Sequence, residues 1–347
     1  MKIVLPHRPF PPTPVVPPTP VVVPPLNLPD VPFTSGRADS PRVSRNDFNM
    51  LGDDLRHQFN ANRDRRFFRE LFDDWYGADG VRLRDPDDEI EDDVYGLMGV
   101  GDAGYLTEAV NADDVYDFGH EGEQSGDYTI ENQTAENEEP VEFWEALDNG
   151  DYVRVLSDRH GTIPEEEFRN RARRLVVNLN SQATGLRVAR ALTPLFKEED
   201  LRDKFTQFKV YLSTAAAPDK LVKNDKLVLY YLLGENTQNG ADVVGSKLAT
   251  AVQDVLGPGE ANLSISPFYS RLTQAVSWSE EAENFLDDAE GLSFTETRAK
   301  VIAQVISDNP NVTDPAALEV LVKQAFAGKG IRPDARHRHL DPPPART

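Results

Sequence analysis

The residues best suited to chemistry in this sequence are cations and tyrosines beside short apolar segments. Lys209 lies in an alternating run, so its side chain is expected to project from the polar face together with that of Tyr211. Arg298 lies in the first turns of a predicted helix, where free N–H groups and a guanidinium suit a phosphate. The full set is Lys209, Lys220, Lys223, Arg271 and Arg298, with Tyr211 and Tyr230.

Such a set could bind a phosphorylated serine or threonine, remove its α-proton and expel phosphate. Partial burial and neighbouring cations lower the pKa of a lysine amine and make it a usable base. This β-elimination needs no metal and no organic cofactor, and we predict neither. The competing interpretation is structural, because cations on strand faces are usually solvated or paired with carboxylates.

Other chemistries find little support in the sequence. It contains no cysteine, which excludes a thiol nucleophile and a thiolate metal site. It also lacks a glycine-rich phosphate loop, a helical His-Glu metal motif and a nucleophile elbow. His160, followed by a turn glycine, is favoured as a surface turn residue, with a catalytic acid as the alternative.

The elements that must position these cations are predicted around residues 173–231. Leu175, Val177 and Leu179 alternate with Arg174, Val176 and Asn178, which indicates a half-buried strand. An amphipathic helix over 183–196 and strands over 207–212 and 227–233 follow, the last apolar throughout and typical of a central strand. The predicted class is α+β, with a mixed β-sheet flanked by helices.

Composition divides the chain into five regions. We predict a disordered Pro-rich arm over 1–47, a helical segment over 48–80 with an aromatic core stripe, and an acidic, partly flexible insert over 81–140. A lyase-like or effector-like domain follows over 141–330, with capped helices from Ser293 and from Asp314. Residues 331–347 are predicted to form a basic disordered tail in which His337 and His339 are solvated.

The negative charge is concentrated in one part of the chain. Residues 73–151 hold 26 acidic and two basic residues, whereas the rest of the chain is nearly neutral, and the net charge is -22. This argues against nucleic-acid binding, which needs clustered cations, and no apolar run is long enough to cross a bilayer. A solvated insert is the favoured interpretation, and a docking surface for a basic partner or leader peptide is the alternative.

Motifs across residues 174–306 resemble those of a known family. They are Arg174-Leu-Val-Val-Asn178, Phe208-Lys209, Asn224-Asp225-Lys-Leu-Val-Leu-Tyr230, Ser266-Pro-Phe-Tyr-Ser-Arg-Leu272, Ala275-Val-Ser-Trp-Ser279 and Leu292-Ser-Phe-Thr-Glu-Thr-Arg298. In order and spacing they are similar to the Hop A-type effector family. That family includes a type III secreted effector of plant pathogens and lyase components of lanthipeptide and thioamide-peptide biosynthesis, which are similar to phosphothreonine lyases.

The resemblance implies roles for individual residues. Lys209 matches the base that takes the α-proton, and Tyr230 matches the tyrosine of the central strand. Arg298 falls near a phosphate-binding arginine of the family, and the full set of residues that we predict to bind phosphate is Arg298, Arg271, Lys223, Arg174 and Tyr230. The sequence departs from the family pattern where Val176 occupies the place of the expected acid and where Lys223-Asn224 replaces an arginine. Tyr211 and His160 are therefore the candidate acids.

Two functions follow as hypotheses. The first is a phosphoserine/phosphothreonine lyase that acts on a peptide after a partner kinase, in lanthipeptide-type modification in the bacterial cytoplasm. The second is an inactive member of the same fold, acting as a secreted effector or as a partner-binding scaffold. Convergence of Lys209 and Arg298 on one pocket would favour the first, and side chains that point apart would exclude a lyase built on this pair.

Overall fold

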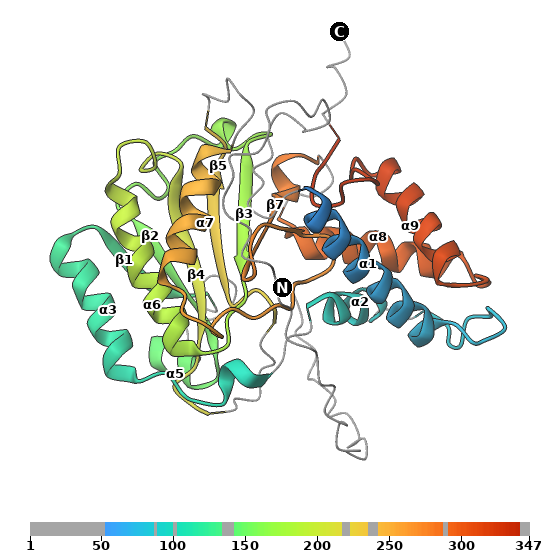
Figure 1. The fold of residues 1–347 in the computed structure, drawn as a ribbon, viewed down its shortest axis with the longest axis horizontal. Coiled ribbons are helices and arrows are strands. Elements are labelled where there is room, and N and C mark those ends of the chain that lie inside the picture. The colour runs from blue at the N-terminus through green and yellow to red at the C-terminus, as the bar shows by residue number, and fades with distance from the viewer. Residues whose placement is uncertain are drawn as a thin grey trace, which may run out of the picture. The chain divides into compact units, whose positions relative to one another are not determined.

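A computed structural model describes residues 53–86, 89–99, 103–133, 142–216, 223–234, 242–286 and 291–340. The Pro-rich arm over 1–47 and Lys220 lie outside these residues, so the predictions made for them stay untested. The described elements confirm the α+β class, with one sheet and helices on both of its faces (Figure 1).

Within the described residues, seven strands form the sheet, in the order β1-β2-β4-β5-β3-β7-β6. Every pairing is antiparallel, which corrects the expectation of a mixed sheet, because no connection between paired strands is a parallel crossover. The predicted strand-helix-strand-strand unit is confirmed, and its apolar last strand is central. The strands are β1 (Tyr128–Asn132), β2 (Asp151–Ser157), β3 (Ala172–Val177), β4 (Phe205–Leu212), β5 (Leu227–Leu232), β6 (Ser270–Arg271) and β7 (Val276–Glu280).

Eight α-helices and four short 3₁₀ helices accompany these strands in the described ranges. The α-helices are α1 (Asp53–Trp75), α2 (Ile90–Gly99), α3 (Ala112–Ser125), α5 (Phe143–Asp148), α6 (Gln182–Leu192), α7 (Val243–Val255), α8 (Phe294–Asp308) and α9 (Pro315–Gly328). The 3₁₀ helices are η1 (Ala103–Leu106), η2 (Glu165–Glu167), η3 (Thr193–Lys197) and η4 (Ala282–Asn284).

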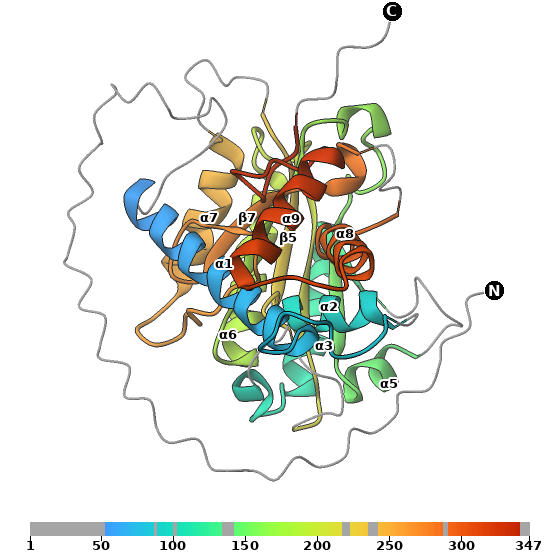
Figure 2. The same cartoon turned by 90° about the vertical axis from the view of Figure 1, so that its right-hand side faces the viewer.

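The two faces of the sheet pack against different helices. Leu175 and Val177 join the core formed with α6 and α7, whereas Val176 between them joins a second core with α1, α2, α8 and α9 (Figures 1 and 2). The aromatic stripe of α1 belongs to this second core. Both faces of β3 are therefore buried, which corrects the expectation of a half-buried strand, because helices cover both sides of the sheet at this position.

The second face is covered only in part. Its core includes Val176 of β3 and Val228 of β5 but no residue of β1, β2 or β4. On this face of β2 and β4, Arg154 and Lys209 are partly exposed and Tyr211 is buried, while the neighbours of Arg154 and Lys209 along each strand are buried on the opposite face. The fold thus leaves a polar half of the sheet open beside an apolar half.

The acidic region is more structured than its composition suggests. It contains α2, α3 and β1, and its apolar residues Val94, Met98, Val115 and Phe118 are fully buried. Helix α3 begins at an N-cap, Asn111, and ends before Gly126 in the left-handed conformation. The many carboxylates hide this apolar periodicity, which is why the sequence indicated a partly flexible insert.

A close approach between α3 and β1 yields a stability prediction. A Cβ atom at Gly122 would lie 2.5 Å from the Tyr128 carbonyl oxygen, so Gly122→Ala is expected to destabilise the fold by about 1–3 kcal/mol. The matched control is Gly96→Ala on α2, where a Cβ meets nothing within 4 Å. Chemical denaturation should show the control to be neutral or stabilising; equal effects at the two glycines would contradict the packing of α3 described here.

The C-terminal segment 331–340 is packed against the fold rather than solvated. Ile331 is fully buried in the second core, and the Arg336 guanidinium lies 2.9 Å from Asp64. His339 is only 4 % exposed, and the His337 ring packs edge-on against Trp278 at 4.7 Å between centroids. The prediction of solvated histidines was therefore wrong, because partners far away in sequence cover this basic segment.

Burial of these histidines makes stability depend on pH. Burial lowers the pKa of His339 to about 4, and burial likewise lowers the pKa of His337 below its ordinary value of 6.5. Below pH 6.5 the unfolded chain then binds protons that the folded chain does not. Each histidine is expected to remove up to about 1.4 kcal/mol per pH unit as pH falls from 6.5 toward 4.

The His337→Phe variant tests this titration, since it keeps an aromatic ring against Trp278 but cannot bind a proton. Denaturation curves between pH 7 and 5 should show a shallower loss of stability in this variant than in the parent. Exposed His120 provides the control, and His120→Phe should leave the slope unchanged. A parent and a His337→Phe variant with equal slopes would show that His337 protonates freely in the folded protein.

Candidate functional site

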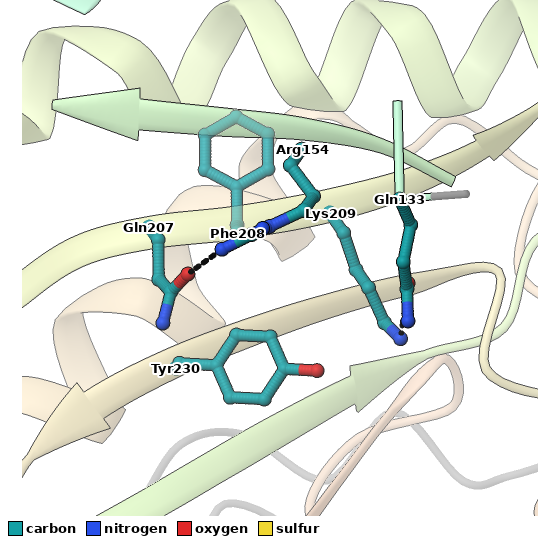
Figure 3. A pocket seen from close by; sticks show the side chains of 6 residues that line it. All are labelled: Gln133, Arg154, Gln207, Phe208, Lys209 and Tyr230. Atoms are coloured by element: carbon teal, nitrogen blue, oxygen red, sulfur yellow. Dashed lines mark hydrogen bonds between the residues drawn. The ribbon is translucent and has the colours of Figure 1, made fainter. Parts of the chain in front are cut away.

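A small polar pocket opens on the uncovered half of the sheet (Figure 3). Its volume is about 170 Å³, which suits a phosphate group with part of the side chain that carries it. Strands β2, β4 and β5 supply most of its walls, and Gln133 follows the end of β1. The lining residues are Gln133, Arg154, Gln207, Phe208, Lys209 and Tyr230, and we call this hollow the Lys209 pocket.

Lys209 is the cation at one side of this pocket. Its Nζ donates a hydrogen bond to Gln133 Oε1 at 3.0 Å and lies 4.0 Å from the centroid of the Tyr152 ring. The aromatic face and the amide hold the amine at a defined place while the pocket remains open beside it. The alternation of β4 explains this position, since Phe208 and Val210 face the opposite core.

Arg154 is a second cation at the pocket, and the sequence did not single it out. It pairs directly with Lys209 across β2 and β4. Its guanidinium lies 2.9 Å from Glu131 and 3.4 Å from Gln207 Oε1, so two neighbouring strands fix its orientation. No signal near Arg154 in the sequence could reveal this, because its partners meet only when the strands pair.

Tyr230 faces Lys209 across the pocket. The phenol oxygen of Tyr230 points toward the amine in Figure 3, and the two residues come from adjacent strands. On its other side, the Tyr230 ring lies 5.3 Å from the Arg174 guanidinium. A hydroxyl donor and an amine therefore lie on opposite sides of a space large enough for a phosphate ester.

Tyr211 shares the face of Lys209 but does not line the pocket. Its ring packs edge-on against Tyr152 at 5.2 Å, and burial raises the pKa of its phenol to about 12. Its hydroxyl has no hydrogen-bond partner among the described residues. We expected Tyr211 to project from the polar face together with Lys209. It lies on that face, but Tyr152 packs against it and leaves the Tyr211 side chain only 5 % exposed.

Lys223 lies near the pocket without lining it. Its Nζ is 3.5 Å from the centroid of the Tyr95 ring, and its side chain passes over Gly99 at the end of α2. Burial lowers the pKa of Lys223, and the nearby positive charge of Lys209 lowers it further, against the opposing effect of Asp225. Lys223 thus contributes positive charge beside the pocket.

Arg298 does not converge on the pocket with Lys209. Its side chain is fully buried, stacks 3.7 Å over the Phe294 ring and donates a hydrogen bond to the Arg336 carbonyl at 3.0 Å. Burial lowers the pKa of this guanidinium to about 9. The C-terminal segment thus engages Nη2 of Arg298, whereas Nε and Nη1 are buried and have no hydrogen-bond partner among the described residues.

The other predicted ligands have different surroundings. Arg174 forms a two-point ion pair with Glu281, and Arg271 donates to backbone carbonyls that include Gln274 at 2.8 Å. Arg271 lies on β6, four strands from Lys209 on β4, which is about 19 Å. His160 lies in the turn after β2, beyond the end of the strand, and does not line the pocket.

The described residues contain no group of three or more His, Asp or Glu side chains arranged for a metal ion. Within the same ranges, no helix is long and apolar enough to cross a membrane.

The fold and the pocket together define an α+β protein with a small basic site on the open half of an antiparallel sheet. The chain belongs to the HopA1 effector protein family, whose model matches residues 146–338. That range includes six of the seven strands and five of the six residues that line the pocket. Membership of this effector family fits the expectation of a secreted effector. The comparison with curated proteins returned no match.

Two solved structures share the fold. One is the effector protein from Pseudomonas syringae pv. syringae strain 61, with 14% identity and a TM-score of 0.54, covering 82% of this chain and 98% of that chain. The other is the effector protein from Pseudomonas syringae pv. tomato strain DC3000, with 14% identity and a TM-score of 0.55, covering 82% of this chain and 99% of that chain. At this identity the similarity establishes the fold alone.

Proposed function

We propose that this effector-family protein binds a phosphorylated serine or threonine side chain in the Lys209 pocket and eliminates phosphate from it. The supporting observation is the placement of Lys209, Arg154 and Tyr230 around one open hollow of about 170 Å³. The Arg154 guanidinium suits the phosphate dianion, and a neutral Lys209 amine and the Tyr230 phenol suit the two proton transfers of an elimination.

The elimination would proceed in one step. A neutral amine at Lys209 Nζ takes the proton from the substrate Cα, and the released electron pair forms the Cα–Cβ double bond. The Cβ–O bond breaks, its electrons go to the phosphate oxygen, and the Tyr230 hydroxyl protonates that oxygen. The products are a dehydroamino acid and hydrogen phosphate, and solvent returns a proton from the Lys209 ammonium to the Tyr230 phenolate.

The positive charges around the pocket would stabilise the departing phosphate. Arg154 is held by Glu131 and Gln207, so its guanidinium needs little reordering to meet a phosphate. The Lys223 amine, which lies against the face of the Tyr95 ring, adds positive charge near the pocket. In this arrangement Tyr230 takes the acid role that the sequence assigned to Tyr211 or His160, because neither of those lines the pocket.

The substrate would be a peptide already phosphorylated by a partner kinase, as in lanthipeptide-type modification, or a host phosphoprotein if the chain is secreted. Both sources present the same phosphomonoester to the pocket. A bacterial cytoplasmic reaction and a secreted effector are therefore two settings for one proposed activity.

Mass spectrometry of a phosphothreonine peptide and a phosphoserine peptide incubated with the protein tests this proposal. Loss of phosphoric acid to a dehydroamino acid is the expected result. Arg154→Ala should reduce the elimination about 10- to 100-fold through lost phosphate binding, whereas Arg159→Ala, a surface arginine in the turn after β2, should not. Peptides that neither bind nor lose phosphate would contradict the proposal.

A second candidate function is binding without catalysis, and one observation favours it. Arg174 and Arg298, both expected to hold phosphate, do not line the Lys209 pocket, because Arg174 is paired with Glu281 and Arg298 is fully buried. A protein that retained only the Lys209 pocket could bind a phosphorylated partner without eliminating its phosphate. Phosphate-dependent binding with unchanged peptide mass would identify this function.

A further inference from the structure

The two basic side chains at the Lys209 pocket have partners of different charge. Glu131 on β1 and Gln133 just after it lie two residues apart, so their side chains share one face of the sheet. Glu131 lies 2.9 Å from the Arg154 guanidinium. Gln133 Oε1 instead accepts a hydrogen bond from Lys209 Nζ at 3.0 Å (Figure 3). The guanidinium therefore has a carboxylate partner, whereas the amine has a neutral amide.

Backbone contacts fix both groups that touch the Lys209 amine. The Gln133 N–H donates to the Tyr152 carbonyl oxygen at 2.9 Å, which extends the pairing of β1 with β2 by one residue. The Tyr152 ring lies against the amine, with 4.0 Å between Nζ and the ring centroid. The Tyr152 hydroxyl donates to the Asp225 carbonyl oxygen at 2.9 Å, which holds that ring in place. The amide and the ring are thus both positioned before any substrate binds.

The neutrality of this amide matters for a lysine that must accept a proton. Among the described residues, no carboxylate lies within ion-pair distance of the Lys209 amine. A carboxylate there would stabilise the ammonium and oppose loss of its proton. An amide oxygen accepts an N–H from an ammonium or from a neutral amine, so the Gln133 hydrogen bond can persist while the proton moves.

We propose that Gln133 is a positioning residue that aims the Lys209 amine into the pocket in both of its protonation states. This inference rests on the proposed function and adds a residue to it. The amide takes one N–H of the amine, and the Tyr152 ring covers another side. The lone pair of the neutral amine is then directed into the open pocket, on the side of Tyr230, where the substrate Cα would lie.

A pH profile of elimination from a phosphothreonine peptide tests this role. Gln133→Glu puts a carboxylate of nearly the same shape beside the amine, so the acidic limb of the profile should move upward by about one pH unit. Below the midpoint, such a shift lowers the neutral fraction, and with it the rate, about 10-fold. Gln133→Met keeps the length but loses the hydrogen bond, and should lower kcat about 10- to 100-fold while the limb and KM stay unchanged.

Matched variants separate a local contact from a general effect of charge. Gln253→Glu introduces the same charge at an exposed position of α7, which packs on the other face of the sheet, and its profile should match that of the parent. The Glu131→Gln/Gln133→Glu double variant keeps the net charge of the parent. Its acidic limb should still move upward, because the carboxylate now lies beside Lys209 instead of Arg154.

A titration of the free protein tests the same contact without turnover. The protein is labelled with carbon-13 at the lysine carbon that bears the amine and is followed by NMR from neutral to alkaline pH. The Lys209 signal is identified by its absence from the Lys209→Arg variant. Its titration midpoint should lie about one pH unit higher in Gln133→Glu than in the parent, and should be unchanged in Gln253→Glu.

The two measurements distinguish failure of this inference from failure of the proposed function. If the parent eliminates phosphate but Gln133→Glu moves neither the Lys209 signal nor the acidic limb, the role of Gln133 is overturned and the proposed function stands. If the Lys209 signal moves but the parent eliminates no phosphate, the contact is supported and the proposed function is overturned, together with the catalytic use of the contact. Loss of peptide binding in Gln133→Met would make Gln133 a phosphate ligand and would overturn the positioning role.

Discussion

The Lys209→Ala variant is expected to lower the rate of phosphate elimination by about 10²- to 10⁴-fold, the contribution typical of a general base. The amine lies at the pocket beside Arg154 and opposite Tyr230, so its removal takes away both a cation and the proton acceptor. Elimination should be followed by mass spectrometry under conditions in which the parent converts all of the peptide.

The Lys209→Arg variant separates the two roles of this lysine. A guanidinium retains the charge but stays protonated, so peptide binding should survive while elimination is lost. Lys323→Ala, at a solvent-exposed lysine on α9, is the control and should behave as the parent. Full elimination by Lys209→Ala would show that another group takes the α-proton.

The Asp242→Ala variant is expected to destabilise the fold by about 3–5 kcal/mol, the effect of breaking a buried ion pair. Asp242 is fully buried, lies 2.8 Å from Arg173 Nη1 and accepts a hydrogen bond from the Tyr231 hydroxyl at 2.7 Å. It also caps α7 by accepting from the Gly245 N–H at 2.8 Å. One substitution therefore affects a strand pair, a helix and a buried guanidinium.

Urea denaturation measures this effect, and a double variant identifies its cause. Arg173→Met combined with Asp242→Ala should be more stable than Asp242→Ala alone, because the cation that lost its closest carboxylate is also removed. An Asp242→Ala protein within about 1 kcal/mol of the parent would contradict a central structural role for this ion pair.

Local sequence patterns predicted the central sheet well, for a physical reason. In β4 the alternation of apolar side chains reflects the buried face that carries Phe208 and Val210, and burial of β5 on both faces requires its continuous apolar run. The capping box of Ser293 and Glu296 is likewise confirmed, because such a cap depends on residues only three positions apart.

The surroundings of the predicted cations could not be read in the same way. Whether Arg298 meets a ligand or a backbone carbonyl depends on Arg336, which lies 38 positions away. Arg154 gains its place at the pocket from Glu131 and Gln207, which lie on other strands. These contacts follow from the strand order and from the path of the C-terminal segment. No periodic pattern in the sequence predicts either of them.

The most direct test is a crystal structure with a peptide that carries the phosphonomethyl analogue of phosphoserine, which has no Cβ–O bond to break. The phosphonate oxygens are predicted to contact Lys209 Nζ and the Arg154 guanidinium, with the Tyr230 hydroxyl directed at the bridging carbon. A phosphonate bound at Arg298 or Arg271, with the Lys209 pocket unchanged, would contradict the proposed site.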